Sequence, residues 1–273
     1  MSSGLSYCGE RVRQGDPERF RDALFAPPDQ REGLFALYAF NLELAKIAPM
    51  VSEPMLGEIR LQWWRDSLDM AEAGEPRRHA VAEPLAAITR EAGLPRALMD
   101  AMIDARASDL EPGFPQDDPA LMRYLSQTAG SLTALAAQAL VPTLSDAGRE
   151  AAQQAGLGIG AARYILALPV LAAQGRAPLA GSIDWSALRN GGRSEALQER
   201  LGSLAETGLA AIRAARDARR DIPRDAIPAL LEVGLAERVL RDIRGADSFA
   251  ELSPPSEFRR QFGRLWRGTI RRW

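Results

Sequence analysis

The 273-residue chain is nearly devoid of cysteine, histidine and lysine, with a single residue of each: Cys8, His79 and Lys46. One cysteine and one histidine exclude a disulfide framework and a zinc site built from these two side chains. The free cysteine is typical of a protein in a reducing compartment. His79 lies in a polar break between predicted helices, where we expect a solvated loop side chain rather than a catalytic base.

Residues that favour β-strands are also scarce. Val, Ile and Thr together number 25, whereas Ala and Leu together number 82. Because sheets favour β-branched side chains and helices favour Ala and Leu, this composition predicts an all-α fold. Clusters of Pro and Gly divide the chain into segments of helix length, and none is long or polar enough to be a domain linker. We therefore predict a single domain over residues 1–273.

Neither charge is in large excess, since 34 basic residues stand against 36 acidic ones and the isoelectric point is near 5.7. This balance excludes a globally basic nucleic-acid-binding protein, and we expect no nucleic acid among the partners. The N-terminus lacks a basic segment followed by an apolar run, so we expect no signal peptide and a cytoplasmic protein.

Long apolar stretches are absent apart from residues 156–175, which contain no acidic residue. This stretch is long enough to span a membrane. However, Arg163, Pro169 and several glycines interrupt it, and the sequence offers no second span to pair with it. We therefore predict a helix buried at the centre of a bundle and no transmembrane span, because a helix that is apolar on all sides is typical of a buried position.

Short motifs follow one another along the chain in a fixed order. They are residues 20–27 (FRDALFAP), Arg31, residues 36–40 (ALYAF), residues 103–106 (IDAR) with Asp109 and Leu110, Tyr124 with Ala129 and Gly130, and Gly175 and Arg176 with Leu179. In order and spacing they resemble the squalene/phytoene synthase family over residues 8–245. The resemblance implies a single-domain, all-α bundle of the isoprenoid-synthase type with a central cavity, in agreement with the composition.

The same resemblance implies two aspartate-rich motifs, which in active members hold Mg²⁺ ions against the diphosphate of a prenyl substrate. The first family pattern is Cys-Arg-Arg-x-Asp-x-x-x-Asp. It aligns with residues 41–49 (NLELAKIAP), so that its two aspartates fall on Ala45 and Pro49 and Lys46 lies between them.

The second family pattern, Asn-x-x-Arg-Asp-x-x-x-Asp, aligns with residues 163–171 (RYILALPVL). Its asparagine falls on Arg163 and its two aspartates fall on Ala167 and Leu171. All four carboxylates are thus missing, and without them an enzyme of this type cannot hold its metal ions. We therefore assign no catalytic residue, no metal ligand and no cofactor.

Within the family, the chain resembles a divergent branch, that of the complex I assembly factor with a phytoene-synthase-like domain. Residues 57–66 (GEIRLQWWRD) carry this resemblance most clearly. It implies a non-catalytic protein that acts in respiratory complex I assembly at the inner membrane, with assembly intermediates as partners. Trp63 and Trp64 are then candidate partner contacts, because Trp is enriched at interface hot spots, although a buried Trp pair explains the same letters.

Two alternatives stay open. The first is a prenyltransferase of squalene or phytoene synthase type with a divergent site, which would need Mg²⁺ held by other acids. The second is an isoprenoid or lipid binding module that keeps only the cavity. The candidates for a residual polar cavity are Tyr38, Asn41, Glu43, Asp104 and Asp109.

Residues 258–273 contain six arginines and no acidic residue. On a helical wheel the apolar side chains fall on one face and most arginines on the other, which is typical of a helix at a membrane interface. A final bundle helix that packs on the core is the alternative. The candidate membrane contacts are Phe258, Phe262, Arg264, Trp266, Arg267 and Arg271. We therefore expect a protein peripheral to the inner membrane, with an anionic membrane surface as a partner.

Overall fold

The computed structural model describes residues 4–111, 113–173 and 195–245, together with positions 179, 181, 183 and 273. Over these residues the regular secondary structure is helical, and they contain no strand. The all-α fold that the excess of Ala and Leu predicts is therefore confirmed.

The helices have the following bounds. The α-helices are α1 (Tyr7–Gly15), α2 (Pro17–Ala23), α3 (Arg31–Ala45), α4 (Ile47–Met50), α5 (Pro54–Glu72), α6 (Ala82–Glu91), α7 (Arg96–Ala107), α8 (Asp118–Leu125), α9 (Ser131–Leu140), α10 (Asp146–Ala173), α12 (Glu195–Asp217) and α13 (Val233–Gly245). The shorter segments are the 3₁₀-helices η1 (Ser108–Leu110), η3 (Arg219–Asp221) and η4 (Arg224–Leu230) and the π-helix η2 (Ser126–Gly130).

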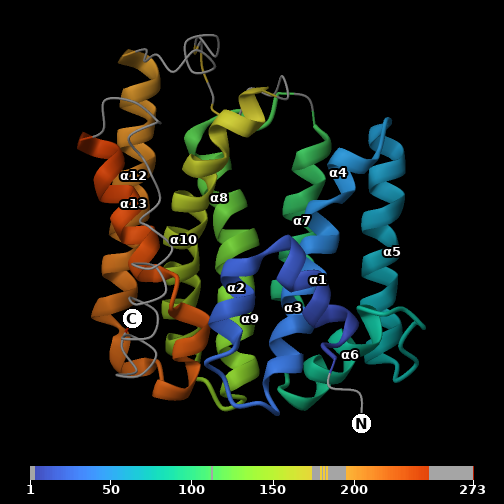
Figure 1. Ribbon diagram of the computed structural model, residues 1–273. Coiled ribbons are helices and arrows are strands. Elements are labelled where there is room, and N and C mark those ends of the chain that lie inside the picture. Colours follow the sequence, from blue (N-terminus) through green and yellow to red (C-terminus); the bar gives the residue numbers. More distant parts are fainter. Residues whose placement is uncertain are drawn as a thin grey trace.

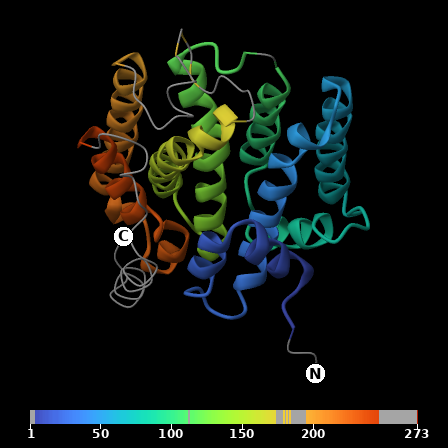
Figure 2. The same ribbon diagram turned by 45° about the horizontal axis from the view of Figure 1, so that its top comes forward.

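The long helices run side by side along the length of the molecule (Figure 1). A tilted view shows α9 and α10 in the middle, α12 and α13 on one side, and α3, α5 and α7 on the other (Figure 2). The buried apolar residues of the described chain form one continuous core, which fits the predicted single domain.

Helices α9 and α10 form the centre because their residues are small or apolar. Every residue of α9 is buried, and the buried residues of α10 are mostly Ala and Gly. An added Cβ at Gly156 would lie 2.5 Å from the carbonyl oxygen of Ala129, and one at Gly158 would lie 2.4 Å from the Ile212 side chain. Among the described helices, α10 alone is long and apolar enough to cross a membrane, but it packs against α9, α12 and α13. The prediction of a buried central helix is confirmed for most of residues 156–165, whereas Leu166, Val170 and Ala173 near the end of α10 are exposed.

His79 corrects one expectation. It lies in the loop before α6, as predicted, but its side chain is partly buried rather than solvated. Nδ1 accepts hydrogen bonds from the backbone N–H groups of Val81 at 3.2 Å and Ala82 at 3.3 Å, which caps the start of α6. The ring also packs edge-on against Trp63 and Trp64, with centroids 5.1 and 5.6 Å away.

The close approach of α10 to η2 gives a test of the core. Gly156→Ala should lower the free energy of unfolding by about 1–3 kcal/mol, because the new methyl group has no room beside the Ala129 carbonyl. Gly202→Ala in α12 is the matched control, since no heavy atom lies within 4 Å of its added Cβ. It should raise the same quantity by up to about 1 kcal/mol. Urea unfolding measures both, and a stabilising Gly156→Ala would contradict the close packing.

Candidate functional site

The first aligned motif lies where α3 passes into α4. Helix α3 ends at Ala45, Lys46 follows as its C-cap, and Pro49 lies within α4. Proline has no N–H group to donate to the Ala45 carbonyl, so the two motif positions do not share one continuous helix. The Lys46 ammonium lies 3.8 Å from the Glu43 carboxylate. The two positions that carry aspartates in the family pattern are therefore separated here by a helix break and by the positive charge of Lys46.

The second aligned motif lies on the last turns of α10. Ala167 and Leu171 occupy the aspartate positions, and both are half-buried. The neighbouring Leu166 and Val170 are exposed, at 40% and 59%, so this end of the helix presents apolar side chains.

Neither segment has the carboxylate ligands that a magnesium ion needs. Mg²⁺ is held by carboxylate and other oxygen ligands in near-octahedral geometry. Within the part of the chain that the structure describes, no group of three or more His, Cys, Asp or Glu side chains is placed to hold a metal ion. The residues present do not fit the metal ions that the family pattern implies.

A different arrangement of charges begins one helical turn before Ala167. The Arg163 guanidinium donates to both carboxylate oxygens of Asp16, at 2.7 and 3.0 Å. It also donates to both oxygens of Glu232, one bond being 2.9 Å long. Asp16 is the N-cap of α2, and Glu232 lies between η4 and α13. One side chain of α10 thus links three regions that are distant in sequence.

Arg19 and Asp22 lie beside these three residues. We call the whole group the Arg163 cluster, and it consists of Asp16, Arg19, Asp22, Arg163 and Glu232. The exposed fraction is 3–8% for every member except Arg163, whose side chain is 33% exposed. Arg19 donates to Asp16 at 3.0 Å, so two arginines face two ion-paired carboxylates. Burial would raise the pKa of Asp16, but the charges of Arg163 and Arg19 outweigh it and hold that pKa well below its usual value.

Asp22 is the fifth group and is only 3% exposed. Burial, and next the negative charge of Glu232, raise the pKa of Asp22 well above its ordinary value. The raised pKa favours the protonated, neutral form of Asp22 in the folded protein. Five ionisable side chains can share this site because Arg19 and Arg163 balance the charges of Asp16 and Glu232, and the fifth, Asp22, is shifted toward its neutral form.

A second polar group, the Tyr124 cluster, consists of Arg106, Asp109 and Tyr124. Arg106 donates to Asp109 at 3.1 Å and to the Tyr124 hydroxyl at 2.6 Å, and that hydroxyl donates to Asp109 at 3.1 Å. Burial raises the pKa of the Tyr124 phenol. Helix α8 ends at Leu125, the residue after Tyr124, and continues into the π-helix η2, a distortion that often accompanies functional sites.

The five residues predicted for a residual polar cavity are not brought together. Tyr38 is buried beside the Arg163 cluster, with the Arg19 guanidinium 5.7 Å from its ring centre. Asp109 belongs to the Tyr124 cluster. Asn41 is half-buried on α3.

The other two candidates, Glu43 and Asp104, each form an ion pair with a different arginine. Glu43 accepts a hydrogen bond from Arg11 of α1 at 3.0 Å. Asp104 accepts one from Arg65 of α5 at 2.7 Å, and its side chain is 60% exposed. A shared metal site would need these carboxylates to converge on one point, and their positions differ.

The predicted partner contacts occupy different environments. Trp64 is 5% exposed and packs edge-on against Phe40 at 5.1 Å, so it is a core residue. Trp63 is partly buried, and the Arg77 guanidinium lies 5.4 Å from its ring centre. The predicted membrane contacts all lie outside the described residues: Phe258, Phe262, Arg264, Trp266, Arg267 and Arg271.

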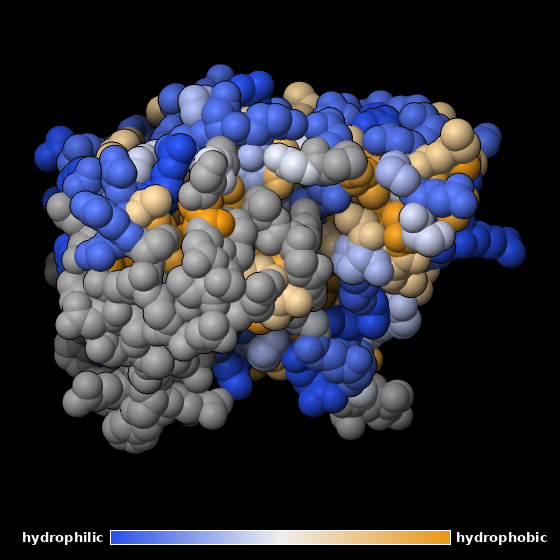
Figure 3. All heavy atoms as spheres, turned by 90° about the horizontal axis from the view of Figure 1, so that it is seen from above, coloured by the Kyte–Doolittle hydropathy of each residue, from blue (hydrophilic) through white to orange (hydrophobic). Residues whose placement is uncertain are grey.

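An exposed apolar surface on α4 and the start of α5 was not expected. We call it the α4–α5 patch, and it consists of Met50, Met55, Leu56 and Ile59, which are 63%, 72%, 45% and 59% exposed. Seen from above, apolar side chains gather at this side of the molecule (Figure 3). The signal in the sequence is that Met55 and Ile59 lie one turn apart, on the face of α5 opposite the buried Leu61.

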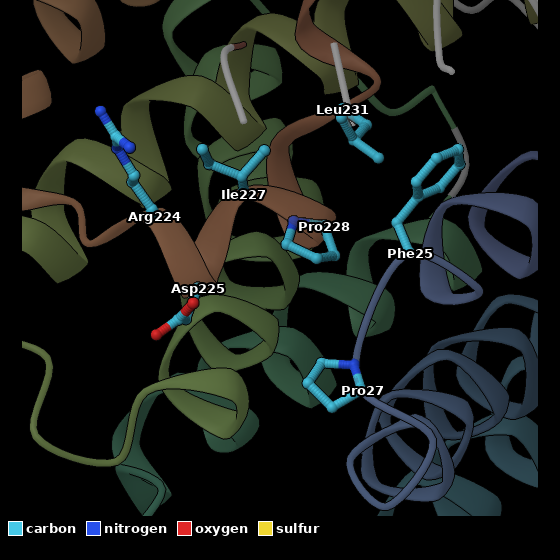
Figure 4. A pocket seen from close by; sticks show the side chains of 7 residues that line it. All are labelled: Phe25, Pro27, Arg224, Asp225, Ile227, Pro228 and Leu231. Carbon is cyan, nitrogen blue, oxygen red and sulfur yellow. The ribbon is translucent and has the colours of Figure 1, made fainter. Parts of the chain in front are cut away.

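One small cavity lies where the turn after α2 meets η4 (Figure 4). Its lining residues are Phe25, Pro27, Arg224, Asp225, Ile227, Pro228 and Leu231. Its volume is about 40 Å³, enough for a few water molecules but not for a prenyl chain. It is therefore not the central cavity that the resemblance implies.

Solved structures define the class of fold. The chain is similar to squalene synthase HpnC from Alicyclobacillus acidocaldarius, with a TM-score of 0.75 and 17% identity over 87% of this chain and 92% of that one. It is also similar to a dehydrosqualene synthase solved with a ligand, with a TM-score of 0.77 and 15% identity over 97% and 95%. The described helices thus form the all-α fold of the isoprenoid synthases.

The family follows from the sequence match. The family model described as squalene/phytoene synthase matches residues 12–264, and the chain belongs to this family.

Curated relatives place the chain within a branch of the family. NADH dehydrogenase (ubiquinone) complex I, assembly factor 6 of Bos taurus is 29% identical over 250 residues, which cover 88% of this chain and 74% of that protein. The Mus musculus protein of the same name is 26% identical over 249 residues, with the same coverage. The predicted divergent branch is confirmed.

The uncharged state of Asp22 gives a prediction for the pH dependence of stability. With its folded pKa raised, Asp22 binds a proton in the folded chain and loses it on unfolding, so stability falls as pH rises from about 4 through the folded pKa. Asp22→Asn removes that dependence and should raise Tm relative to the wild type increasingly toward alkaline pH. Glu58→Gln on the exposed face of α5 is the control and should leave the pH profile unchanged. Parallel profiles of Asp22→Asn and wild type would contradict the neutral Asp22.

Proposed function

We propose that the protein is a non-catalytic member of the squalene/phytoene synthase family that acts in the assembly of respiratory complex I. The observation that carries the proposal is the relationship to complex I assembly factor 6 over 88% of the chain. The absence of metal ligands at both aligned motifs supports it independently.

The chemistry of the two motif segments argues against prenyl transfer. Ionisation of a prenyl diphosphate needs cations that neutralise the leaving group. The side chains of Ala45, Pro49, Ala167 and Leu171 have no oxygen atom to bind such a cation. We therefore infer that the protein works without a metal cofactor, and that its role rests on binding other molecules.

Binding to an assembly intermediate requires an accessible surface, and the α4–α5 patch supplies one. Four large apolar side chains that are 45–72% exposed lie together there, whereas scattered single ones are ordinary for a surface. Two of them are methionines, whose flexible side chains adapt to irregular apolar partners. We infer that this patch contacts a complex I component or another assembly protein.

The place of action in this proposal is the inner membrane, where the protein is peripheral. Helix α10 packs into the core, and so the membrane contact that we propose is made by the basic residues 258–272, outside the described part of the chain. The residue that follows them, Trp273, is described, and its partly buried side chain packs against the core. Each arginine near an anionic lipid surface contributes about 1 kcal/mol.

Deletion of the gene in the organism that encodes this chain tests the proposed role. NADH:ubiquinone oxidoreductase activity should fall, and native gels of the membranes should show incomplete complex I. The wild-type gene on a plasmid should restore both. Normal complex I in the deletion strain would contradict the assembly role, and loss of a squalene- or phytoene-type product would favour the enzyme instead.

The patch itself can be tested by exchange of two side chains. Met55→Ser with Ile59→Ser should reduce the recovery of complex I components in pull-downs from detergent-solubilised membranes several-fold, because the apolar contact area is lost. Tm should change little, since both side chains are exposed in the free protein. Gln62→Ser, farther along α5, is the matched control. Unchanged recovery with the double variant would exclude the α4–α5 patch as the contact.

A further inference from the structure

The Arg163 cluster stands on the segment of α10 that aligns with the second aspartate-rich motif. Arg163 itself falls on the asparagine of that pattern, one turn before the first missing aspartate at Ala167. The helix thus carries a fixed positive charge at a position where the family pattern has a neutral, oxygen-bearing side chain.

The contacts of Arg163 resemble those of a bound cation more than those of a surface ion pair. Its guanidinium contacts four carboxylate oxygens, two on Asp16 and two on Glu232. These carboxylates come from α2 and from the turn before α13, and both are more than nine-tenths buried. A metal ion held between helices likewise collects oxygens from several elements at one point.

The charge balance depends on this contact. Without Arg163, Arg19 would be the one arginine of the cluster left to face Asp16 and Glu232, and the cluster would hold an excess of buried negative charge. Leaving a buried charge uncompensated is strongly unfavourable, so the three elements would separate or take up a cation from solution.

We propose that Arg163 is a permanent internal cation, which joins α2, α10 and α13 and makes the arrangement of these helices independent of divalent metal ions. Arg163 forms hydrogen bonds with both carboxylate oxygens of Asp16 and of Glu232, so these oxygens are not available to bind a metal ion. This inference concerns the family's metal-binding segment alone and does not depend on the partner in complex I assembly.

The first test is on the wild-type protein, with Mg²⁺ and Mn²⁺ as probes. Millimolar Mg²⁺ or excess EDTA should leave Tm unchanged, and Mn²⁺ should give no saturable binding by electron paramagnetic resonance. Stabilisation of the wild type by either ion, or loss of Tm in EDTA, would overturn the proposal.

The second test replaces the internal cation. Arg163→Asn should lower Tm by about 10 °C, and Mn²⁺ or Mg²⁺ should recover part of that loss because carboxylates are left without their counter-charge. Arg216→Asn is the matched control, since Arg216 makes two hydrogen bonds, of 2.7 and 2.6 Å, to Glu237 between α12 and α13. It should show no response to metal. An Arg163→Asn variant with wild-type Tm would contradict the proposal.

If Arg163→Asn folds poorly, a comparison of a single variant with a charge-compensated double variant tests the same proposal. Arg163→Met leaves an excess negative charge, whereas Arg163→Met with Glu232→Gln removes one carboxylate charge together with the arginine charge and keeps the 3.0 Å pair of Arg19 with Asp16. The double variant should have the higher Tm of the two and no metal response. A double variant no more stable than Arg163→Met would show that Arg163 does not act through its charge.

Discussion

The structure depends on one contact above all, the two-sided hydrogen bonding of the Arg163 guanidinium to Asp16 and Glu232. Asp16 and Glu232 are 147 and 69 positions away from Arg163 in sequence, so the contact links the start of α2, the central helix α10 and the turn before α13, the last helix that the structure describes. The two carboxylates are buried, and they tolerate this because Arg19 and Arg163 balance their charges, while the raised pKa of Asp22 favours its neutral form.

The central helix explains why a synthase fold persists here without synthase motifs. Small residues along α10 allow η2 and α12 to approach closely, and this packing does not require the carboxylates of a metal site. The end of α10 presents Leu166 and Val170 instead of acids, and α3 is interrupted before Pro49. The packing that maintains the fold is therefore separate from the residues of the two aspartate-rich motifs, which agrees with the proposed role in complex I assembly.

Much of the fold could be predicted from the sequence, because helix preference and close helix packing are encoded locally in Ala, Leu and Gly. The missing metal ligands were also evident, since they depend on residue identity at aligned positions. The partners of the charged residues could not be predicted, because nothing in the local pattern indicates that Arg163 contacts Asp16. The same holds for the separate ion pairs that Glu43 forms with Arg11 and Asp104 forms with Arg65. The solvent exposure of individual apolar side chains could not be predicted either, since Trp64 lies in the core while Met55 of the same helix is 72% exposed.

The central claim, that the protein has no prenyltransferase activity, is tested most directly by measuring diphosphate release. Purified, folded protein is incubated with farnesyl and geranylgeranyl diphosphate in the presence of Mg²⁺ or Mn²⁺ and compared with a heat-denatured sample. We predict equal release in the two samples. Release well above the denatured control, and its loss in Asp109→Ala, would contradict the account and reveal a catalytic site formed without the two aspartate-rich motifs.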